Sequence, residues 1–428
     1  MNPREFLNIL FDLAVQKAHP KVCLPPFLDK NKLCGRTLVF GAGKASAAMA
    51  QAVENELPGK IEGLVVTRYN YSVPCKKIEV IEAGHPIPDN NGMMAASKML
   101  KIASTLEAND TVIFLISGGG SSLLSLPASS LSLQDKKEIT TELLNSGATI
   151  HEINIVRKHI SAIKGGKLAL ACYPAKVITL AISDVSGDDL AIIASGPTFE
   201  DSSTFSDAKN ILKKYNINSP KSVLNYINNA IDETPKPGDF RLKNVENCLI
   251  ASSKQSLEES AKFARNFGIE PIILSDSVEG EAREVAKIHA FQAKNFQKKI
   301  GSNARPLVVL SGGETCVTVR GNGIGGPNTE YLLSMLIELG GHNGIWAIAC
   351  DTDGIDGFGD NAGAFISPDS LKISKSLGLD PIKFLNNNDS YNFFSKIGSL
   401  VSSGPTFTNV NDFRAILISP TGKQKIFD

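Results

Sequence analysis

The sequence predicts an α/β protein of two domains: an N-terminal three-layer αβα domain with a mainly parallel sheet, and a C-terminal α/β domain with a mixed sheet. Three observations predict this class. The chain has 428 residues, whereas a single hydrophobic core stops growing at roughly 250–300 residues. Its 42% hydrophobic and 21% charged residues are typical of a globular protein. Short apolar runs ending in Gly, Ser or Asp alternate with helix-like periodicity, as in βα units.

The first half of the chain carries the alternation typical of a parallel sheet. Helices are expected between its apolar runs, over residues 44–56, 134–145 and 155–172. Because parallel strands need long crossovers, these helices would cover both faces of the sheet. The apolar runs expected as strands are residues 37–44, 63–67, 77–85, 111–120 and 176–184.

A polar stretch over residues 232–244, rich in proline and charged side chains, predicts the domain linker. The expected domains are therefore residues 1–235 and 245–428. Some apolar runs beyond the linker are too close together for a crossover helix, which predicts the mixed sheet. The runs expected as strands there are residues 247–253, 270–276, 305–314, 316–320, 344–354 and 413–419.

Charge and composition exclude several classes of partner. Lys and Arg number 44 and Asp and Glu also number 44, so no global field would hold the chain on nucleic acid or anionic lipid. No apolar run is long enough for a membrane span, and the first 20 residues indicate an amphipathic helix and not a signal peptide. The seven scattered cysteines favour reduced thiols in a cytoplasmic protein. The oligomeric state stays open, with a homodimer among the alternatives.

Three glycine-rich turns, at residues 41–44, 117–122 and 321–326, are candidates for phosphate binding. Glycine lets backbone N–H groups approach a phosphate, and a following helix adds partial positive charge. The alternative is that each is a tight turn that only glycine can make. None matches Walker A or a dinucleotide-binding fingerprint. The candidate residues in the first two turns are Gly43, Ser117, Gly118, Gly119, Gly120 and Ser121.

Charged residues stand near these turns. Lys44 is expected in the first turn of a helix, where a cation is unfavourable unless an anion lies nearby; otherwise it is a solvated lysine. Carboxylates after strands can hold Mg²⁺ or orient a hydroxyl, or can simply form turns. These carboxylates are Asp184, Asp188, Asp189, Asp351 and Asp353.

The expected helix over residues 155–172 places Arg157, Ser161 and Lys164 on one face. The two cations suit a substrate carboxylate or phosphate, or form a solvated basic stripe. His85 and His159 are either proton carriers or packed residues. Together with the glycine turns, these groups indicate phosphoryl transfer by positioning and charge neutralisation. Ser121 lacks the GxSxG elbow of a serine hydrolase.

Seven motifs resemble, in order, those of the bacterial glycerate 2-kinase family with a MOFRL C-terminal region. The resemblance implies ATP- and Mg²⁺-dependent phosphorylation of the C2 hydroxyl of D-glycerate, with the active site in the cleft between two α/β domains. Lys44 matches the lysine that the family uses in catalysis. The motifs are VFGAGKASAAMA, EAGHPIPD, ISGGGSSLL, INIVRKHISAIKGGKLA, ISDVSGDDL with ASGPT, LSGGET and DTDGIDG.

The residue patterns and the motifs together suggest roles for individual residues. Asp184 and Asp189 join Lys44 as catalytic candidates, and Asp184, Asp351 and Asp353 are candidate metal ligands. The remaining candidates for binding substrate or phosphate are Arg157, Lys164, Gly313, Glu314, Asn328 and Glu330.

One position departs from the family pattern. Many relatives read GGRN where this chain has Pro327, so the arginine expected to neutralise phosphoryl charge is missing. Either Arg320 or Arg157 supplies that charge, or the substrate or rate differs. Two alternatives to the kinase stay open: a hydroxypyruvate reductase-type oxidoreductase, and a non-catalytic sugar-acid-binding relative.

Overall fold

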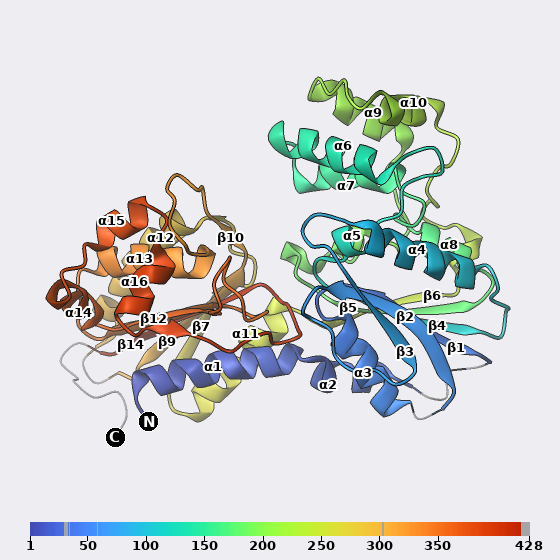
Figure 1. Cartoon of the computed structure of the whole chain (residues 1–428). Helices are drawn as coiled ribbons and strands as arrows, with labels where there is room; N and C mark the ends of the chain where they lie inside the picture. The colour runs from blue at the N-terminus through green and yellow to red at the C-terminus, as the bar shows by residue number, and fades with distance from the viewer. Residues whose placement is uncertain (30–32, 34, 58, 302–303, 421–428) are drawn as a thin grey trace. The chain divides into compact units, whose positions relative to one another are not determined.

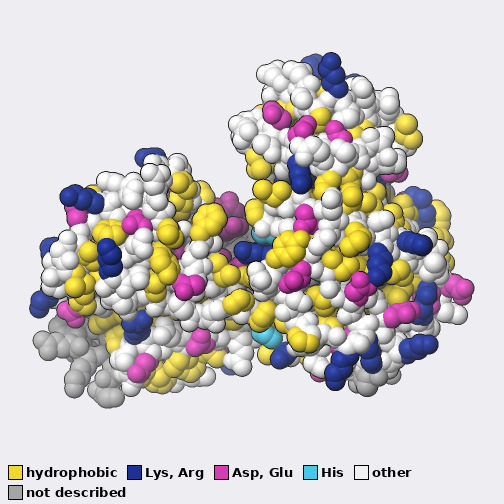
Figure 2. All heavy atoms as spheres, in the orientation of Figure 1, with side chains coloured by type: hydrophobic (Ala, Val, Ile, Leu, Met, Phe, Trp, Pro, Cys, Tyr) yellow, Lys and Arg dark blue, Asp and Glu magenta, His cyan; other side chains and the backbone are white. Residues whose placement is uncertain are grey.

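The computed structural model describes residues 1–29, 33, 35–57, 59–301 and 304–420. The chain forms two compact units. The unit that we call N-terminal comprises Pro20–Ile250, and the unit that we call C-terminal combines Met1–His19 with Ala251–Asp428. On the face shown in Figure 2, acidic and basic side chains are interspersed on each unit. Across the described ranges, no helix combines the length and apolar character needed to cross a membrane.

The N-terminal unit is built on a six-stranded sheet with the order β3-β2-β1-β4-β5-β6. Strands β1 to β5 pair in parallel, as expected. The two central strands, β1 (Thr37–Ala42) and β4 (Thr111–Ile116), are buried along their whole length. The strand order changes direction between them, and open α/β sheets bind ligands at the carboxyl ends of strands at such a point. The other strands are β2 (Ile61–Arg68), β3 (Ile78–Ala83), β5 (Lys176–Ile182) and β6 (Val245–Ala251).

Helices cover both faces of this sheet (Figure 1). Helices α4 (Asn90–Ala103) and α8 (Lys167–Ala171) pack on one face, against side chains such as Phe40 and Phe114. Helix α3 (Ser46–Glu56) covers the opposite face. The unit therefore has the expected three layers. Its shorter helical segments are α2 (Pro20–Cys23), η1 (Pro25–Phe27), α5 (Gly120–Leu123), η3 (Ser186–Asp188), η4 (Ile193–Ser195) and η5 (Phe240–Leu242).

Four further helices of the N-terminal unit form a group with its own hydrophobic core, which we call the helical lobe (Figure 1). Helices α6, α7 and α9 each begin with a capping box, at Ser132, Thr149 and Thr204. These caps satisfy backbone N–H groups that a helix start leaves without partners. The lobe consists of α6 (Leu133–Asn145), α7 (Ile150–His159), α9 (Phe205–Lys214) and α10 (Lys221–Asn229).

The C-terminal unit has a six-stranded mixed sheet with the order β13-β12-β11-β14-β9-β7. Its pairs are antiparallel, except that β7 and β9 are parallel. The mixed sheet is therefore confirmed. Its strands are β7 (Glu270–Ser275), β9 (Leu307–Gly313), β11 (Ile345–Asp351), β12 (Gly363–Ile366), β13 (Leu400–Val401) and β14 (Asp412–Ile418), and β8 (Gly280–Glu281) pairs separately with β10 (Thr315–Cys316).

Two helical layers enclose this second sheet. Helices α12 (Ala282–Lys299) and α13 (Pro327–Leu339) pack on one face, and α1 (Pro3–Ala18) packs with α11 (Ser253–Asn266) on the other. The α1–α11 contact includes hydrogen bonds from the hydroxyls of Ser256 and Ser260 to backbone oxygens of α1. Three shorter helices are α14 (Ser370–Ser376), α15 (Pro381–Asn386) and α16 (Ser390–Lys396).

The division differs from the expected residues 1–235 and 245–428 in two respects. Helix α1 belongs to the C-terminal unit, because its apolar face covers the second sheet. Strand β6, expected in the second domain, lies at the edge of the first sheet beside β5. The polar stretch over residues 232–244 is part of the N-terminal unit, where Thr234 donates a hydrogen bond to Asp201.

Two elements are shorter than expected. The helix expected over residues 155–172 is broken into α7, which ends at His159, and α8, which begins at Lys167 directly after Gly165 and Gly166 with φ values of 59° and 83°. Such left-handed values do not occur inside a continuous α-helix. The strand expected over residues 316–320 is reduced to β10, Thr315–Cys316.

The packing of α1 generates a prediction for stability. Phe11 is 2% exposed, and its ring lies 6.0 Å from that of Phe413 on β14. We expect Phe11→Ala to lower the free energy of unfolding of the C-terminal unit by about 3–5 kcal/mol, because it leaves a cavity in the core. The single tryptophan, Trp346, packs against the same core, so its fluorescence during denaturation with urea measures this loss.

Gln16→Ala, at an exposed position of the same helix, is the matched control and should leave the transition unchanged. An unchanged transition for Phe11→Ala would contradict the assignment of α1 to the C-terminal unit.

Candidate active site

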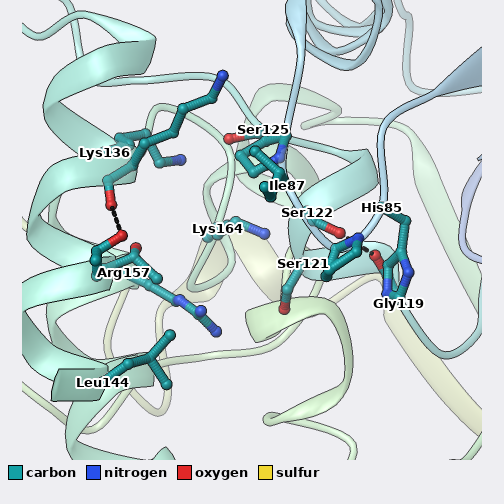
Figure 3. A pocket seen from close by; sticks show the side chains of 15 residues that line it. His85, Ile87, Gly119, Ser121, Ser122, Ser125, Lys136, Leu144, Arg157 and Lys164 are labelled. Carbon is teal, nitrogen blue, oxygen red and sulfur yellow. Dashed lines mark hydrogen bonds between the residues drawn. The ribbon is translucent and has the colours of Figure 1, made fainter. Parts of the chain in front are cut away.

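A cavity of about 570 Å³ opens in the N-terminal unit between the helical lobe and the turns at the carboxyl end of the first sheet. Helices α6 and α7 line one side, with Leu144, Thr140 and Arg157 (Figure 3). The turn after β4, with Gly119 and Ser121, lines the other side. The cavity thus lies beside the switch point of the sheet, where the fold favours a ligand.

Four cationic side chains line this cavity: Lys136 and Lys137 from α6, Arg157 from α7, and Lys164 from the turn after α7. Lys136 is 5% exposed and Lys164 is 2% exposed. Burial, followed by repulsion from Arg157, lowers the pKa of Lys136 to about 7. Burial, followed by the charges of Lys136 and Arg157, lowers the pKa of Lys164 well below its usual value. Burial also lowers the pKa of Arg157.

This cluster lacks an acidic counterpart. No Asp or Glu is among the described residues that line the cavity. Nζ of Lys136 is buried and has no hydrogen-bond partner among the residues that the structure describes. Buried charges without partners are costly, so the arrangement is suited to an anion from outside the chain.

Lys164 is positioned by a turn with unusual backbone geometry. Its Nζ donates a hydrogen bond of 3.0 Å to the carbonyl oxygen of Ala194. Ala194 and Ser195 adopt φ values of 55° and 60°, a region that costs non-glycine residues free energy. The hydroxyls of Ser195 and Ser121 lie 2.9 Å apart, and the Ser195 hydroxyl donates to Asn154. Ser121 is therefore connected to the turn that positions Lys164.

Two of the predicted glycine turns hold each other at the edge of the sheet. Backbone N–H of Lys44 donates to the carbonyl oxygen of Gly118 over 2.8 Å, and that of Ala45 donates to Oγ of Ser117 over 3.0 Å. A Cβ at Gly43 would lie 2.1 Å from Oγ of Ser117. Gly43 and Ser117 are thus needed for the contact between the turns, a role distinct from the phosphate binding expected for them.

The same contact brings Lys44 and His85 close to Gly119. Gly119 has a φ of 80°, and a Cβ built there would lie 2.8 Å from His85 Cδ2 and 3.5 Å from Lys44 Cγ. His85 lines the cavity (Figure 3). Lys44 is partly buried and precedes the first residue of α3, Ser46, so it lies in the turn and not in the helix as expected.

His159 is a packed residue and not a proton carrier in the cavity. It is fully buried, its Nδ1 lies 2.8 Å from the Ile155 oxygen, and its Nε2 lies 2.9 Å from Glu233 Oε1. Its ring also packs edge-on against Phe205. The alternative that the sequence left open for this histidine is therefore the observed one.

The carboxylates expected after β5 lie in an irregular segment. Asp189 is exposed, and its Oδ1 accepts a hydrogen bond of 2.9 Å from the backbone of Ala191. Asp188 has a φ of 55°, and Asp184 is partly buried. None of the three is among the described residues that line the cavity.

In the C-terminal unit, Asp351 and Asp353 form a turn after β11. Asp351 Oδ1 accepts from the backbone N–H of Asp353, and Asp353 Oδ1 accepts from that of Ile355. Carboxylate oxygens are the ligands that Mg²⁺ prefers, so the turn has suitable chemistry for one or two metal bonds. Within the described ranges, no group of three or more His, Cys, Asp or Glu side chains is arranged to hold a metal.

Asn328 and Glu330, expected to bind substrate or phosphate, are buried in polar contacts of the C-terminal unit. Asn328 Nδ2 donates over 2.6 Å to Asp412, which also pairs with Arg414. Glu330 accepts hydrogen bonds from Arg283 over 2.9 Å and from Asn388 over 2.8 Å. Both side chains support the fold around the start of α13.

Helix α13 also explains the departure at Pro327. Pro327 is its first residue, where the fixed φ of proline suits a helix and the missing N–H costs nothing. Asp356 accepts hydrogen bonds from the backbone N–H groups of Asn328 and Thr329. Burial raises the pKa of Asp356 to about 6, although these hydrogen bonds oppose the shift.

The third glycine turn, residues 321–326, is packed against protein. A Cβ at Gly321 or Gly323 would meet the segment from Asn387 to Asp389 at 2.3–2.5 Å. Its glycines are therefore required by close packing, the alternative that the sequence left open. Arg320 and Glu314 nearby are exposed, and Gly313 at the end of β9 has a φ of 104°.

Fold and site together define a two-unit α/β protein with a cation-lined cavity beside a sheet switch point. The chain matches the family described as "domain of unknown function" (DUF4147) over residues 6–228 and the MOFRL family over residues 307–412. It belongs to the family that joins these two regions and includes glycerate 2-kinases. The resemblance of the sequence motifs to that family is confirmed.

Individual relatives cover nearly the whole chain. It is 43% identical over 403 residues to a D-glycerate 2-kinase of Thermotoga maritima, covering 94% of this chain and 93% of the relative. It is 48% identical over 421 residues to an Agrobacterium vitis protein provisionally named a hydroxypyruvate reductase, covering 98% and 95%. A crystal structure of a Thermotoga maritima glycerate kinase superposes with a TM-score of 0.89 at 42% identity, covering 97% of this chain and 99% of that chain.

The cavity is lined by two lysines that the sequence did not predict as site residues, Lys136 and Lys137. A lysine in a helix is usually solvated, so its residue type alone is no signal of a site. A signal was nevertheless present: Lys136, Ile139 and Leu143 follow the i, i+3, i+7 spacing of a buried face, and all three are buried in α6.

The buried Lys136 generates a prediction for stability. Its pKa of about 7 lies well below the ordinary value near 10.4 for an unfolded chain. Folding is therefore penalised increasingly as pH falls from about 10.4 towards about 7, because the unfolded chain binds the additional proton. We expect Lys136→Met to raise the Tm of the unliganded protein, by more at pH 7 than at pH 9.

Differential scanning calorimetry of wild type and variant at both pH values measures this difference. Lys213→Met, at an exposed position of α9 in the same lobe, is the control and should show no such pH-dependent gain. A Tm for Lys136→Met below that of the wild type at pH 7 would refute the unpartnered state of this lysine.

Proposed function

We propose that this chain is a glycerate 2-kinase, which transfers the γ-phosphoryl group of ATP to the C2 hydroxyl of D-glycerate and produces 2-phosphoglycerate and ADP. The observation that carries the proposal is the cavity lined by Lys136, Arg157 and Lys164 without a carboxylate. Such a site is suited to a small anionic substrate. The kinases among the relatives support the choice of glycerate.

Arg157 and Lys164 are proposed to bind the glycerate carboxylate. The two cations no longer share a helix face, because the chain turns after α7, yet both line the same cavity. A guanidinium and an ammonium form charge-assisted hydrogen bonds with a carboxylate. With the carboxylate held at this side, the C2 hydroxyl would point towards Ser121 and Gly119 at the opposite wall.

Lys44 is proposed to neutralise charge on the phosphoryl group during transfer. The C2 oxygen forms a bond to the γ-phosphorus, the bond to the β–γ bridging oxygen breaks, and ADP leaves with that electron pair. The hydroxyl proton passes to a base, for which Asp184 and Asp189 are the candidates. Catalysis of this kind depends on positioning and preorganised charge, which the fixed turns around Gly118 and Gly119 provide.

ATP is proposed to enter as its Mg²⁺ complex, and the ion would lower the charge repulsion between nucleotide and substrate. Asp351 and Asp353 are candidate ligands, as is Asp184. Gly313 and Glu314 stay candidates for phosphate contacts. Three expectations from the sequence stay predictions: an active site shared by the two domains, a cytoplasmic location and a homodimer.

Identification of the product tests the proposed function. Incubation of the chain with ATP, Mg²⁺ and D-glycerate should give 2-phosphoglycerate, which phosphorus NMR distinguishes from 3-phosphoglycerate. Phosphate at C3, or no ATP consumption, would overturn the proposal. Oxidation of NADH with hydroxypyruvate in a parallel reaction would instead favour the reductase, and binding of glycerate without either reaction would favour a non-catalytic relative.

Substitution of Lys44 tests its catalytic role. We expect Lys44→Ala to lower kcat by roughly 10²–10³-fold, the scale of losing one preorganised charge or donor. The KM for D-glycerate should change little, because Lys44 acts on the transferred group. Steady-state kinetics measure both constants.

Lys60→Ala, at an exposed position of the same unit, provides the control for removal of a lysine and should retain the wild-type kcat. A kcat for Lys44→Ala within a few-fold of the wild type would remove Lys44 from the catalytic group.

A further inference from the structure

The cavity contains more cationic side chains than the two assigned above to the glycerate carboxylate, Arg157 and Lys164. Helix α6 of the helical lobe adds Lys137 and the buried Lys136 (Figure 3). An additional buried lysine beside two cations is unfavourable in the empty protein. Its presence therefore points to a ligand whose charge compensates this cost.

Lys136 is held at the cavity by the packing of α6. Ile139 and Leu143 on the same helix face are fully buried in the core of the lobe, so the position of residue 136 is set by the helix. Asp135, the adjacent residue, faces away and accepts hydrogen bonds from Ser132 and Ser222. Helix α6 thus directs the carboxylate of Asp135 away from the cavity and the ammonium group of Lys136 into it.

We propose that Lys136 joins Arg157 and Lys164 in binding the carboxylate of the substrate and couples this binding to the uptake of a proton at its Nζ. The proposal rests on the proposed function for the identity of the substrate, a small 2-hydroxy carboxylate. Lys136 acts here as a binding and specificity-determining residue. The step adds one proton from solvent to Nζ and forms an ion pair with the carboxylate, and no covalent bond changes.

The proton uptake follows from the surroundings of Lys136. The charged or titratable groups facing it are Arg157 from α7, Lys164 from the following turn, Lys137 from α6 and His85 from the opposite wall. The pKa of Lys136 is about 7 when the cavity is empty, and a bound carboxylate favours the charged form and raises that pKa. Above pH 7 the lysine is mostly neutral before binding and charged after it.

Calorimetric titration with D-glycerate in the absence of nucleotide measures the coupling. At pH 8, titrations in Tris and in HEPES differ in heat by the protons exchanged, and we expect a net uptake to which Lys136 contributes about one proton per bound glycerate. At pH 6 Lys136 is already charged, so its contribution, which is the difference in uptake between wild type and Lys136→Met, should be close to zero. The affinity of the wild type should fall as pH rises above 7.

Two substitutions separate the effect of the positive charge of Lys136 from the effect of its proton uptake. Lys136→Met should weaken glycerate binding at pH 7 by about ten- to a hundredfold, the effect of losing one hydrogen bond to a charged group, and should remove the contribution of Lys136 to the uptake. Lys136→Arg keeps a permanent charge, so it should restore binding without restoring that contribution. Lys213→Met on α9 should behave as the wild type.

Equal affinity and equal proton uptake in wild type and Lys136→Met would overturn the inference, as would a wild type that takes up no proton at pH 8. The phosphorylation assay distinguishes this failure from failure of the proposed function. A wild type that phosphorylates D-glycerate without uptake rejects only the role of Lys136. A wild type that binds glycerate with Lys136-dependent uptake but consumes no ATP rejects only the kinase, and a wild type that neither binds nor phosphorylates glycerate rejects both.

Discussion

The contact between the turns after β1 and β4 determines how the candidate site is built. Ser117 Oγ and the Gly118 carbonyl accept hydrogen bonds from the backbone of Ala45 and Lys44, and Gly43 permits the approach because it has no side chain. Parallel strands in adjacent positions bring these turns to one edge. The hydrogen bonds then set the distance between them, so the places of Lys44, Gly119 and His85 follow from this one contact.

On the other side of the cavity, positively charged side chains repel one another. Lys136, Arg157 and Lys164 are brought together by three separate segments, and burial lowers the pKa of each. The core of the helical lobe supplies the packing that tolerates the cluster. A site that is destabilised when empty binds a complementary anion more strongly, because the ligand removes a repulsion that is already present. Stability and function therefore oppose each other at this position.

In the C-terminal unit, the polar side chains around the start of α13 mainly support the fold. Asp356 accepts the first N–H groups of α13, and Asn328 connects the same helix to Asp412. Pro327 fits this arrangement as the first helical residue. A proline there is therefore compatible with an intact helix start, and its presence is no sign of a decayed fold. The turn of Asp351 and Asp353 beside this network keeps the oxygen ligands suited to Mg²⁺.

Local patterns in the sequence determined much of the protein. Alternating apolar runs and glycine turns predicted both α/β units, the parallel and mixed sheets, and the turns that carry Lys44 and Gly119. These features depend on residues close in the chain, so their signals are short-range. Arg157 and Lys164 were also predicted together, although the helix that was expected to align them ends at His159.

Long-range packing decided the rest. Only the tertiary structure places α1 on the second sheet and β6 on the first, because an amphipathic helix or an edge strand does not encode which sheet it joins. Burial and hydrogen-bond partners likewise decided the different roles of two charged residues. Lys136 is a cation at the cavity, whereas Glu330 is a carboxylate paired with Arg283. A charged side chain acquires its role from the groups that fold around it, and those groups come from distant parts of the chain.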